Sequence, residues 1–454
     1  MMLAAAWLAL LLAAPAAATG AAPVEPTAPA SDDAPAREPV ASPGALAVDA
    51  VLPCGLRVLI ARDLTLPVVA SVLAVETGTE DDPKELPGLV HALAFHLLEG
   101  NREWSPGGIT RMIHDGGGVT SLAVGAAQVR FEALAPASLL EDLIAAEASR
   151  LRAPSVSEAL WKDALRWARR DRSRGSNVPP AVRALAFDVE GLAHDGRVVT
   201  PELEAQSPRA IEAQLAERFA YDRASLVLIT PQRPELVFNL VLAAFSDLPP
   251  GPRRSRDRTT PPRTGAVPRE LSIKGGGGAL VWPIAPDPAS QAWASVLCGA
   301  VNRLKRAASE PTRVRLRCAI EDEPRRAVMV LRPSGSDDPV ALVRQRFERL
   351  RTDELELLDK ERATVAEQLA HELRTPLSLA RHLARNAPVR ASEPETPGEA
   401  PPMRALAELL ATTALQPLVP EGGGTPDPWP PALASLFELG GAVRAVEPAK
   451  AAPK

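Results

Sequence analysis

The stretch ELPGLVHALAFHLLEGN, residues 85–101, decides the fold of this chain. It predicts a helix that begins near Leu86, and a glycine-rich turn follows at residues 115–118. Working outward, two strands are predicted before the helix, VLPCGLRVLIARD and PVVASVLAVETGTE, and a third, AQVRFEALAP, after the turn. Strands on both sides of one helix, without regular alternation of strand and helix, are typical of α+β proteins.

Further helices and strands are predicted in the first half, and the second half repeats a similar order of elements. Helices at 137–153 and 156–174 precede the strand ASLVLITP and the helix PELVFNLVLAAFSDLPP. The second half predicts the strand ALVWPIA, a helix at 289–308, the strands RVRLRCAI and RRAVMVLRPS, and then the helices PVALVRQRFERLR, 352–385 and PALASLFELGGAVRAV. We therefore expect an α+β fold of two similar domains, residues 45–250 and 265–447, joined by a polar linker at 251–264.

The N-terminal residues predict export. An apolar run from Leu3 to Ala14 leads into AAA at 16–18, which fits a signal-peptide cleavage site. Residues 19–44 are rich in Pro, Ala, Ser and acidic residues and predict a disordered spacer. We expect a signal peptide at 1–18, a periplasmic location, and no membrane span once the signal is removed. The sequence leaves open whether the signal is cleaved.

Composition excludes two classes of protein. The chain of 454 residues has 51 basic and 56 acidic side chains, a formal net charge of −5, which argues against nucleic-acid or anionic-membrane binding through bulk charge. Apolar residues make up 46% of the chain, so it is not disordered throughout.

The first half resembles the pitrilysin/insulinase family of zinc metallopeptidases. GLVH at 88–91 and LLEG at 97–100 match the two ends of the helix that carries the family's inverted motif H-x-x-E-H. VLPCGLRVLI resembles the family's first hairpin, HDGGGVTSLAVGAAQVRFEAL its Gly-Gly turn and next strand, and FAYDRASLVLITPQRPELVFNLVLAAFSDLPP its closing strand and helix. The resemblance covers about residues 46–250 and implies two similar peptidase-like domains that form half of a clamshell.

The catalytic motif itself is degenerate. His91 stands at the first histidine of the motif, but Ala94 replaces the glutamate that acts as general base and Phe95 replaces the second histidine. His96 is five residues from His91, about 140° around the helix, so one ion cannot easily bridge them. We expect no zinc and no other cofactor, although intact relatives hold zinc.

Two further family positions are also altered. The resemblance places the third zinc ligand, a glutamate in the family, near Asp171, which makes His91 and Asp171 vestigial metal-site candidates. Active relatives use an arginine and a tyrosine of the second domain, or of a partner, to hold the substrate carbonyl. Tyr221 is the only tyrosine of this chain, and it lies in the first half.

We therefore expect a non-catalytic protein, the partner or scaffold subunit of a heterodimeric zinc peptidase that helps to enclose or hold peptide. Its partner would be a homologous chain with an intact zinc motif. Two alternatives stay open: an active zinc endopeptidase with a displaced site built from His91, His96 and Asp171, and a stand-alone peptide-binding protein of the cell envelope.

Two other features need an explanation. Cys298 and Cys318 could form a disulfide in an oxidising compartment, or remain buried thiols. HELRTPLS, residues 371–378, reproduces the phospho-acceptor box of sensor histidine kinases. Only 76 residues follow Ser378, too few for an ATP-binding domain, so we expect this segment to be part of a structural helix.

Overall fold

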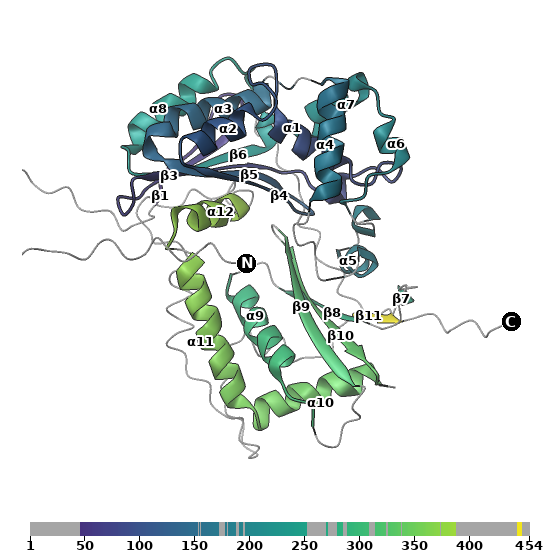
Figure 1. Ribbon diagram of the computed structural model, residues 1–454. Helices are drawn as coiled ribbons and strands as arrows, with labels where there is room; N and C mark the ends of the chain where they lie inside the picture. Colours follow the sequence, from purple (N-terminus) through teal and green to yellow (C-terminus); the bar gives the residue numbers. More distant parts are fainter. Residues whose placement is uncertain are drawn as a thin grey trace, which may run out of the picture. The chain divides into compact units, whose positions relative to one another are not determined.

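The computed structural model describes most of the chain between Leu46 and Asn386 and one further strand near the C-terminus (Figure 1). The described residues are 46–152, 154, 156–171, 178, 180–187, 190–193, 196–251, 269–270, 279–284, 288–307, 314–323, 326–336, 338–372, 374–386 and 443–446. The predicted signal peptide, the spacer at 19–44 and nearly all of the linker at 251–264 lie outside the described residues.

The first sheet has six strands in the order β1-β2-β6-β3-β5-β4. Strands β2 and β6 pair in parallel, and the other neighbouring strands pair antiparallel. The strands predicted in this half are confirmed, and VLPCGLRVLIARD contains the turn of a hairpin. The bounds are β1 Leu46–Val51, β2 Arg57–Arg62, β3 Val68–Val75, β4 Val119–Val124, β5 Val129–Pro136 and β6 Ala224–Thr230.

The central strands β3 and β6 are covered on both faces. Val69, Leu73 and Val75 of β3 pack in the main core with the helices of the first half. Alternate residues, among them Val72, pack on the other face against Leu379 of a helix from the second half. Strands buried on both faces read as nearly continuous apolar runs, which is the pattern of VVASVLAV and ASLVLIT.

Helices of the first half cover one face of this sheet, and Figure 1 shows α1, α2, α3 and α8 there. The α-helices are α1 Leu89–Glu99, α2 Gly108–Asp115, α3 Leu140–Arg152, α4 Glu158–Arg170, α5 Pro180–Phe187, α6 Pro201–Glu204, α7 Pro208–Arg218 and α8 Pro234–Ala244. Short 3-10 turns lie at Thr79–Asp81, Ala137–Leu139, Glu190–Ala193 and Tyr221–Arg223. The helix predicted from Leu86 begins at Leu89, because Gly88 is its N-cap.

The second sheet has the order β7-β11-β8-β10-β9. A second core joins it to α9, α10 and α11 around the buried Trp293 and Phe347. Its strands are β7 Arg269–Glu270, β8 Ala279–Ile284, β9 Arg315–Glu323, β10 Arg326–Ser334 and β11 Val443–Val446, and its helices are α9 Pro288–Arg303, α10 Pro339–Thr352 and α11 Leu355–Glu372.

The sequence predicts a helix through the whole of PALASLFELGGAVRAV. This prediction is wrong at its last four residues, 443–446, which form strand β11. These four residues pair with β7 and β8, so sheet pairing decides their conformation. The other predicted elements of the second half that lie among the described residues are confirmed, with one exception, the long helix at 352–385.

The prediction of a single helix at 352–385 is wrong, because the helical conformation is interrupted twice. α11 begins at Leu355, after the last residues of α10, and ends at Glu372; α12 is Pro376–Asn386. A proline removes a backbone donor and restricts the residue before it, so Pro376 opens a new helix instead of continuing the old one. The kinase-like segment therefore lies across a helix junction, and α12 is the helix that covers the second face of the first sheet.

None of the helices among the described residues is both long and apolar enough to cross a membrane. α+β is the fold class that the sequence predicted.

Candidate functional site

The N-terminus of α1 is fixed by two residues that precede it. Gly88 has φ 85°, a left-handed conformation that glycine adopts without strain. The carboxylate of Asp82 accepts hydrogen bonds from the backbone N–H groups of Gly88 and Val90, both at 2.8 Å. A carboxylate on the first turn satisfies unpaired N–H donors there and favours the helix dipole. This arrangement sets the position of His91 one residue later.

Burial raises the pKa of Asp82 to about 7, and the N–H groups of Val90 and Gly88 and the charge of Arg218 only partly oppose that rise. The folded protein therefore binds this proton more tightly than the unfolded chain, whose carboxyl titrates near 3.8. Its contribution to stability is present at low pH and is lost as pH rises through about 7.

We expect Asp82→Asn to remove that dependence. Between pH 5 and 8 the free energy of unfolding of the unmodified chain should lose about 2–3 kcal/mol more than that of the variant, since one pKa unit corresponds to about 1.4 kcal/mol. Urea unfolding at several pH values measures it, with the exposed Asp353→Asn as control. Parallel pH curves for the unmodified chain and Asp82→Asn would contradict the assignment.

His91 and Asp171, the two vestigial candidates, are brought together. The Nε2 atom of His91 lies 3.1 Å from a carboxylate oxygen of Asp171, which follows the last residue of α4. His91 is 1% exposed, and the ring of Phe95, one turn further along α1, lies 5.2 Å from its imidazole ring. Phe95, at the position where the resemblance implies a second zinc ligand, thus packs its aromatic ring against His91. The carboxylate of Asp171 forms a hydrogen bond with the same imidazole.

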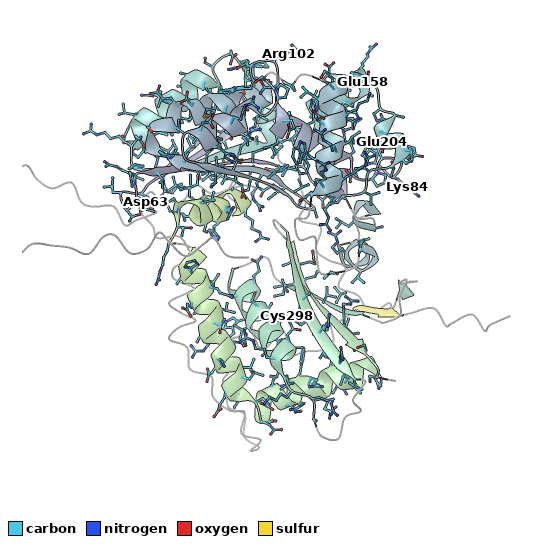
Figure 2. All side chains as sticks on the ribbon, in the orientation of Figure 1. Asp63, Lys84, Arg102, Glu158, Glu204 and Cys298 are labelled. Atoms are coloured by element: carbon cyan, nitrogen blue, oxygen red, sulfur yellow. A yellow bond between two sulfur atoms is a disulfide. The ribbon has the colours of Figure 1, made fainter. Side chains whose placement is uncertain are left out.

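His96 is separated from this pair along α4. Its ring packs at 6.2 Å from Trp161, which lies in the first turn of α4, whereas Asp171 follows the last residue of that helix. Glu158, the first residue of α4, is labelled in Figure 2. Ten residues of α-helix span about 15 Å. A displaced site built from His91, His96 and Asp171 therefore requires one ion to reach both ends of α4.

These residues do not fit a zinc ion. A protein zinc site needs at least three nitrogen, sulfur or oxygen ligands at about 2 Å. Ala94 is buried and has no donor atom, Phe95 has none, and the remaining pair supplies two. Within the described part of the chain, no three His, Cys, Asp or Glu side chains are grouped so that they could hold a metal ion. Tyr221, the only tyrosine, packs against the first core at a 3-10 turn.

The C-terminal end of α1 is held by a buried charge pair that sequence reasoning missed. Arg150 of α3 donates to the carbonyl oxygen of Leu97 at 2.7 Å and to Glu147 at 3.1 Å, and its guanidinium lies 4.8 Å from the Phe131 ring centre. Burial raises the pKa of Glu147, while the charge and hydrogen bond of Arg150 oppose that rise. The signal available in the sequence was the pair Glu147 and Arg150, two charged residues three positions apart on a helix face that is otherwise apolar.

Strand β4, which follows the glycine-rich turn, is an edge of the first sheet. The resemblance places an asparagine of the family at Thr120 or Ser121, and the Ser121 hydroxyl donates to Glu132 at 2.7 Å. Arg381 of α12 donates to the same carboxylate at 2.8 Å and approaches the Ser121 hydroxyl. Burial would raise the pKa of Glu132, but Arg381, Ser121 and Arg130 hold it below its ordinary value. Ser121 thus helps to fasten α12 to the sheet.

Comparison with solved structures supports the same fold. The chain superposes on a protease from Helicobacter pylori with a TM-score of 0.64 and 13% identity, over 88% of this chain and 99% of that one. It also matches a peptidase M16 inactive domain from Pseudomonas fluorescens, with a TM-score of 0.60 and 13% identity, over 89% of this chain and 99% of that one.

A third match differs in length. The periplasmic protease PqqL from Escherichia coli aligns with a TM-score of 0.62 and 15% identity over 89% of this chain, which spans 48% of that protein. No family model and no curated protein matches the sequence. At these identities the comparisons establish a shared fold, the one that the resemblance of the first half predicted.

Proposed function

We propose that this chain is a non-catalytic pitrilysin/insulinase-like protein that serves as the partner or scaffold subunit of a zinc peptidase. The observation that carries the proposal is the His91 imidazole, hydrogen-bonded to Asp171 at 3.1 Å and covered by Phe95 where a second ligand would stand. With Ala94 in place of the general base, the described residues around His91 supply neither a set of three metal ligands nor the motif's glutamate to activate water. Its contacts cross-link α1 to α4 without a metal.

A partner role is supported by the sizes of the matched proteins. PqqL is about twice as long as the matched region, whereas the H. pylori protease and the inactive M16 domain are each covered almost completely. A chain with this fold can therefore be one half of a longer enzyme or a separate protein. We propose that it pairs with a homologous chain whose zinc motif is intact, in the periplasm where PqqL is found.

Peptide holding is supported by the edge strand β4. An edge strand presents unpaired N–H and C=O groups to which an extended peptide can add. All six residues from Val119 to Val124 are partly or fully exposed, and Val119 is 57% exposed. The peptide would lie beside α1 in the same half, so a subunit that holds it needs no catalytic residue of its own.

The first test is metal content. We expect the purified chain to hold no stoichiometric zinc after dialysis, and to cleave no unfolded protein. Phe95→His adds a third donor beside His91 and Asp171, so it should take up about one zinc per chain. Adding Asp171→Asn to that variant should lose the metal again. One tightly held zinc in the unmodified chain, lost on His91→Ala, would overturn the non-catalytic proposal.

The second test is association. The chain should form a dimer with a homologue that has an intact H-x-x-E-H motif, and the pair should cleave peptides faster than the homologue alone. A stable interface typically buries about 1,600 Å² or more. Co-expression, light scattering and a peptide-cleavage assay measure this. A chain that stays monomeric at micromolar concentration and leaves the homologue's rate unchanged would favour the stand-alone peptide-binding protein instead.

A further inference from the structure

Strands β9 and β10 carry a cationic surface that the proposed function does not use. Arg317 of β9 is the direct cross-strand partner of Arg332 of β10, and Arg315 pairs with Ser334. All three arginines are exposed. Residues at even positions of β9, such as Cys318, face the core with α9, so the three arginines lie together on the opposite face of the sheet. We call Arg315, Arg317 and Arg332 the arginine surface.

The arginine surface has no counter-charge among the described residues. Other arginines of this half form ion pairs: Arg303 with Glu361, Arg349 with Glu354, Arg351 with Glu348 and Arg362 with Asp359. No carboxylate of the described residues is within ion-pair distance of the three arginines, and none of the three has a further interaction. Like charges directly opposite one another destabilise a sheet, so this arrangement has an energetic cost that no ion pair with a described residue offsets.

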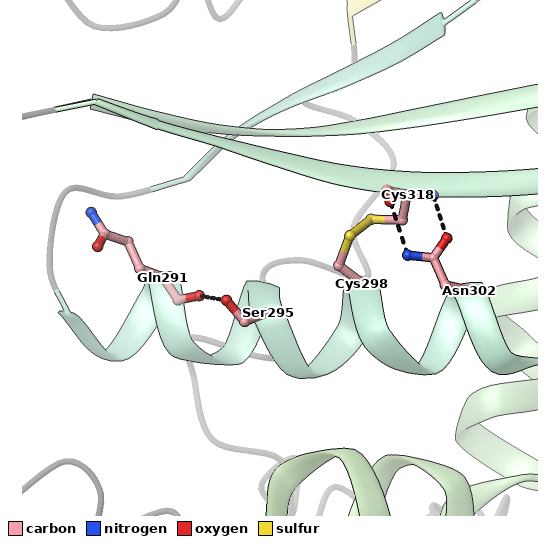
Figure 3. The surroundings of a disulfide bond; sticks show 5 residues. All are labelled: Gln291, Ser295, Cys298, Asn302 and Cys318. Atoms are coloured by element: carbon pink, nitrogen blue, oxygen red, sulfur yellow. Dashed lines mark hydrogen bonds between the residues drawn. A yellow bond between two sulfur atoms is a disulfide. The ribbon is translucent and has the colours of Figure 1, made fainter. Parts of the chain in front are cut away.

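The neighbouring edge of the sheet is blocked at Cys318. Asn302 of α9 donates to the carbonyl oxygen of Cys318 at 2.9 Å and accepts from its N–H at 2.8 Å (Figure 3). The backbone groups of Cys318 therefore point away from β10, and Asn302 occupies the outer edge of β9 where another strand would pair. At Cys318, therefore, an added strand cannot pair with the edge of β9, whereas the exposed arginines offer side-chain contacts on the face of the sheet.

We propose that the arginine surface binds an extended acidic peptide segment. Successive residues on one face of a strand are about 6.6 Å apart, and alternate side chains of an extended peptide have the same spacing. Carboxylates at alternate positions would thus meet Arg315 and Arg317, with Arg332 across the ladder. Guanidinium groups suit this ligand because they bind carboxylates through two parallel hydrogen bonds. This site shares no residue with the degenerate zinc motif.

The test uses the full chain and a fluorescent peptide of alternating Glu and Ala. Changing Arg315, Arg317 and Arg332 together to Gln should weaken binding at least about tenfold, and added salt should weaken binding to the unmodified chain. The matched control changes Arg344, Lys360 and Arg374 to Gln, which removes the same charge from other exposed positions and should leave binding within about twofold.

A second measurement separates binding from folding. Because Arg332 faces a like charge, Arg332→Gln should raise the melting temperature by a few degrees while it weakens peptide binding. Equal losses in the arginine-surface variant and the control would overturn the proposal, since bulk charge would then explain them. Tighter binding of polyphosphate or a single-stranded oligonucleotide that displaces the peptide would also overturn it.

Discussion

Gly88→Ala is expected to destabilise the protein by on the order of 3–5 kcal/mol, enough to unfold a marginally stable domain. An alanine Cβ at this position would lie 1.9 Å from the carbonyl oxygen of Val198, far inside van der Waals contact, and that atom is backbone. The left-handed φ of 85° adds about 1–2 kcal/mol for any residue with a side chain. The backbone at Val198 must therefore move away, or α1 must lose its N-cap residue.

Gly117→Ala is the matched control. This glycine has the same φ, 85°, but no atom lies within 4 Å of a Cβ built on it. Only the conformational term remains, so we expect a loss of about 1–2 kcal/mol. Urea unfolding followed by circular dichroism gives both values. If the two substitutions cost the same, the close approach of Val198 to α1 is not what makes Gly88 necessary.

Sequence reasoning found the elements whose burial or motif leaves a recognisable pattern in the sequence. Strands such as β3 and β6 are apolar along their whole length because helices cover both faces, and α1 was recognisable from one motif. The sequence could not say which helix covers the second face of the first sheet. That helix, α12, is separated from β3 by about 300 residues, and its contact depends on the interruption of one predicted helix at Pro376.

The candidate site was predicted in its positions and not in its interactions. The resemblance identified His91, Ala94, Phe95 and Asp171, and the structure places His91 within hydrogen-bonding distance of Asp171, 80 residues away. Spacing alone could not show whether these side chains meet, because the contact depends on how α1 packs against α4. The pair Arg381–Glu132 was missed for the same reason: an ion pair across elements leaves no periodic pattern in the sequence. Glu147 and Arg150 lie three residues apart on α3, but their spacing could not show that Arg150 also reaches the carbonyl oxygen of Leu97 in α1.

The sequence left the state of Cys298 and Cys318 open, and the structure joins them in a disulfide between α9 and β9, with Cα atoms 5.2 Å apart (Figure 3). Changing both to Ala is expected to cost about 3 kcal/mol, because the link closes a loop of about 20 residues and restricts the unfolded chain. The second half depends on this link because Cys318 lies on an edge strand, which a single neighbouring strand pairs.

Urea unfolding should show that a reducing agent lowers the unmodified chain to the level of the double variant and leaves the double variant unchanged. Cys54→Ala controls for the loss of a buried thiol, since Cys54 is free and buried in the first half. Cys54→Ala should lower the free energy of unfolding by less than the double variant does. The reducing agent should then lower the stability of Cys54→Ala by the same amount as that of the unmodified chain. A double variant as stable as the unmodified chain would mean that the hydrogen bonds of Asn302 to the backbone of Cys318 hold α9 against β9 without the covalent link.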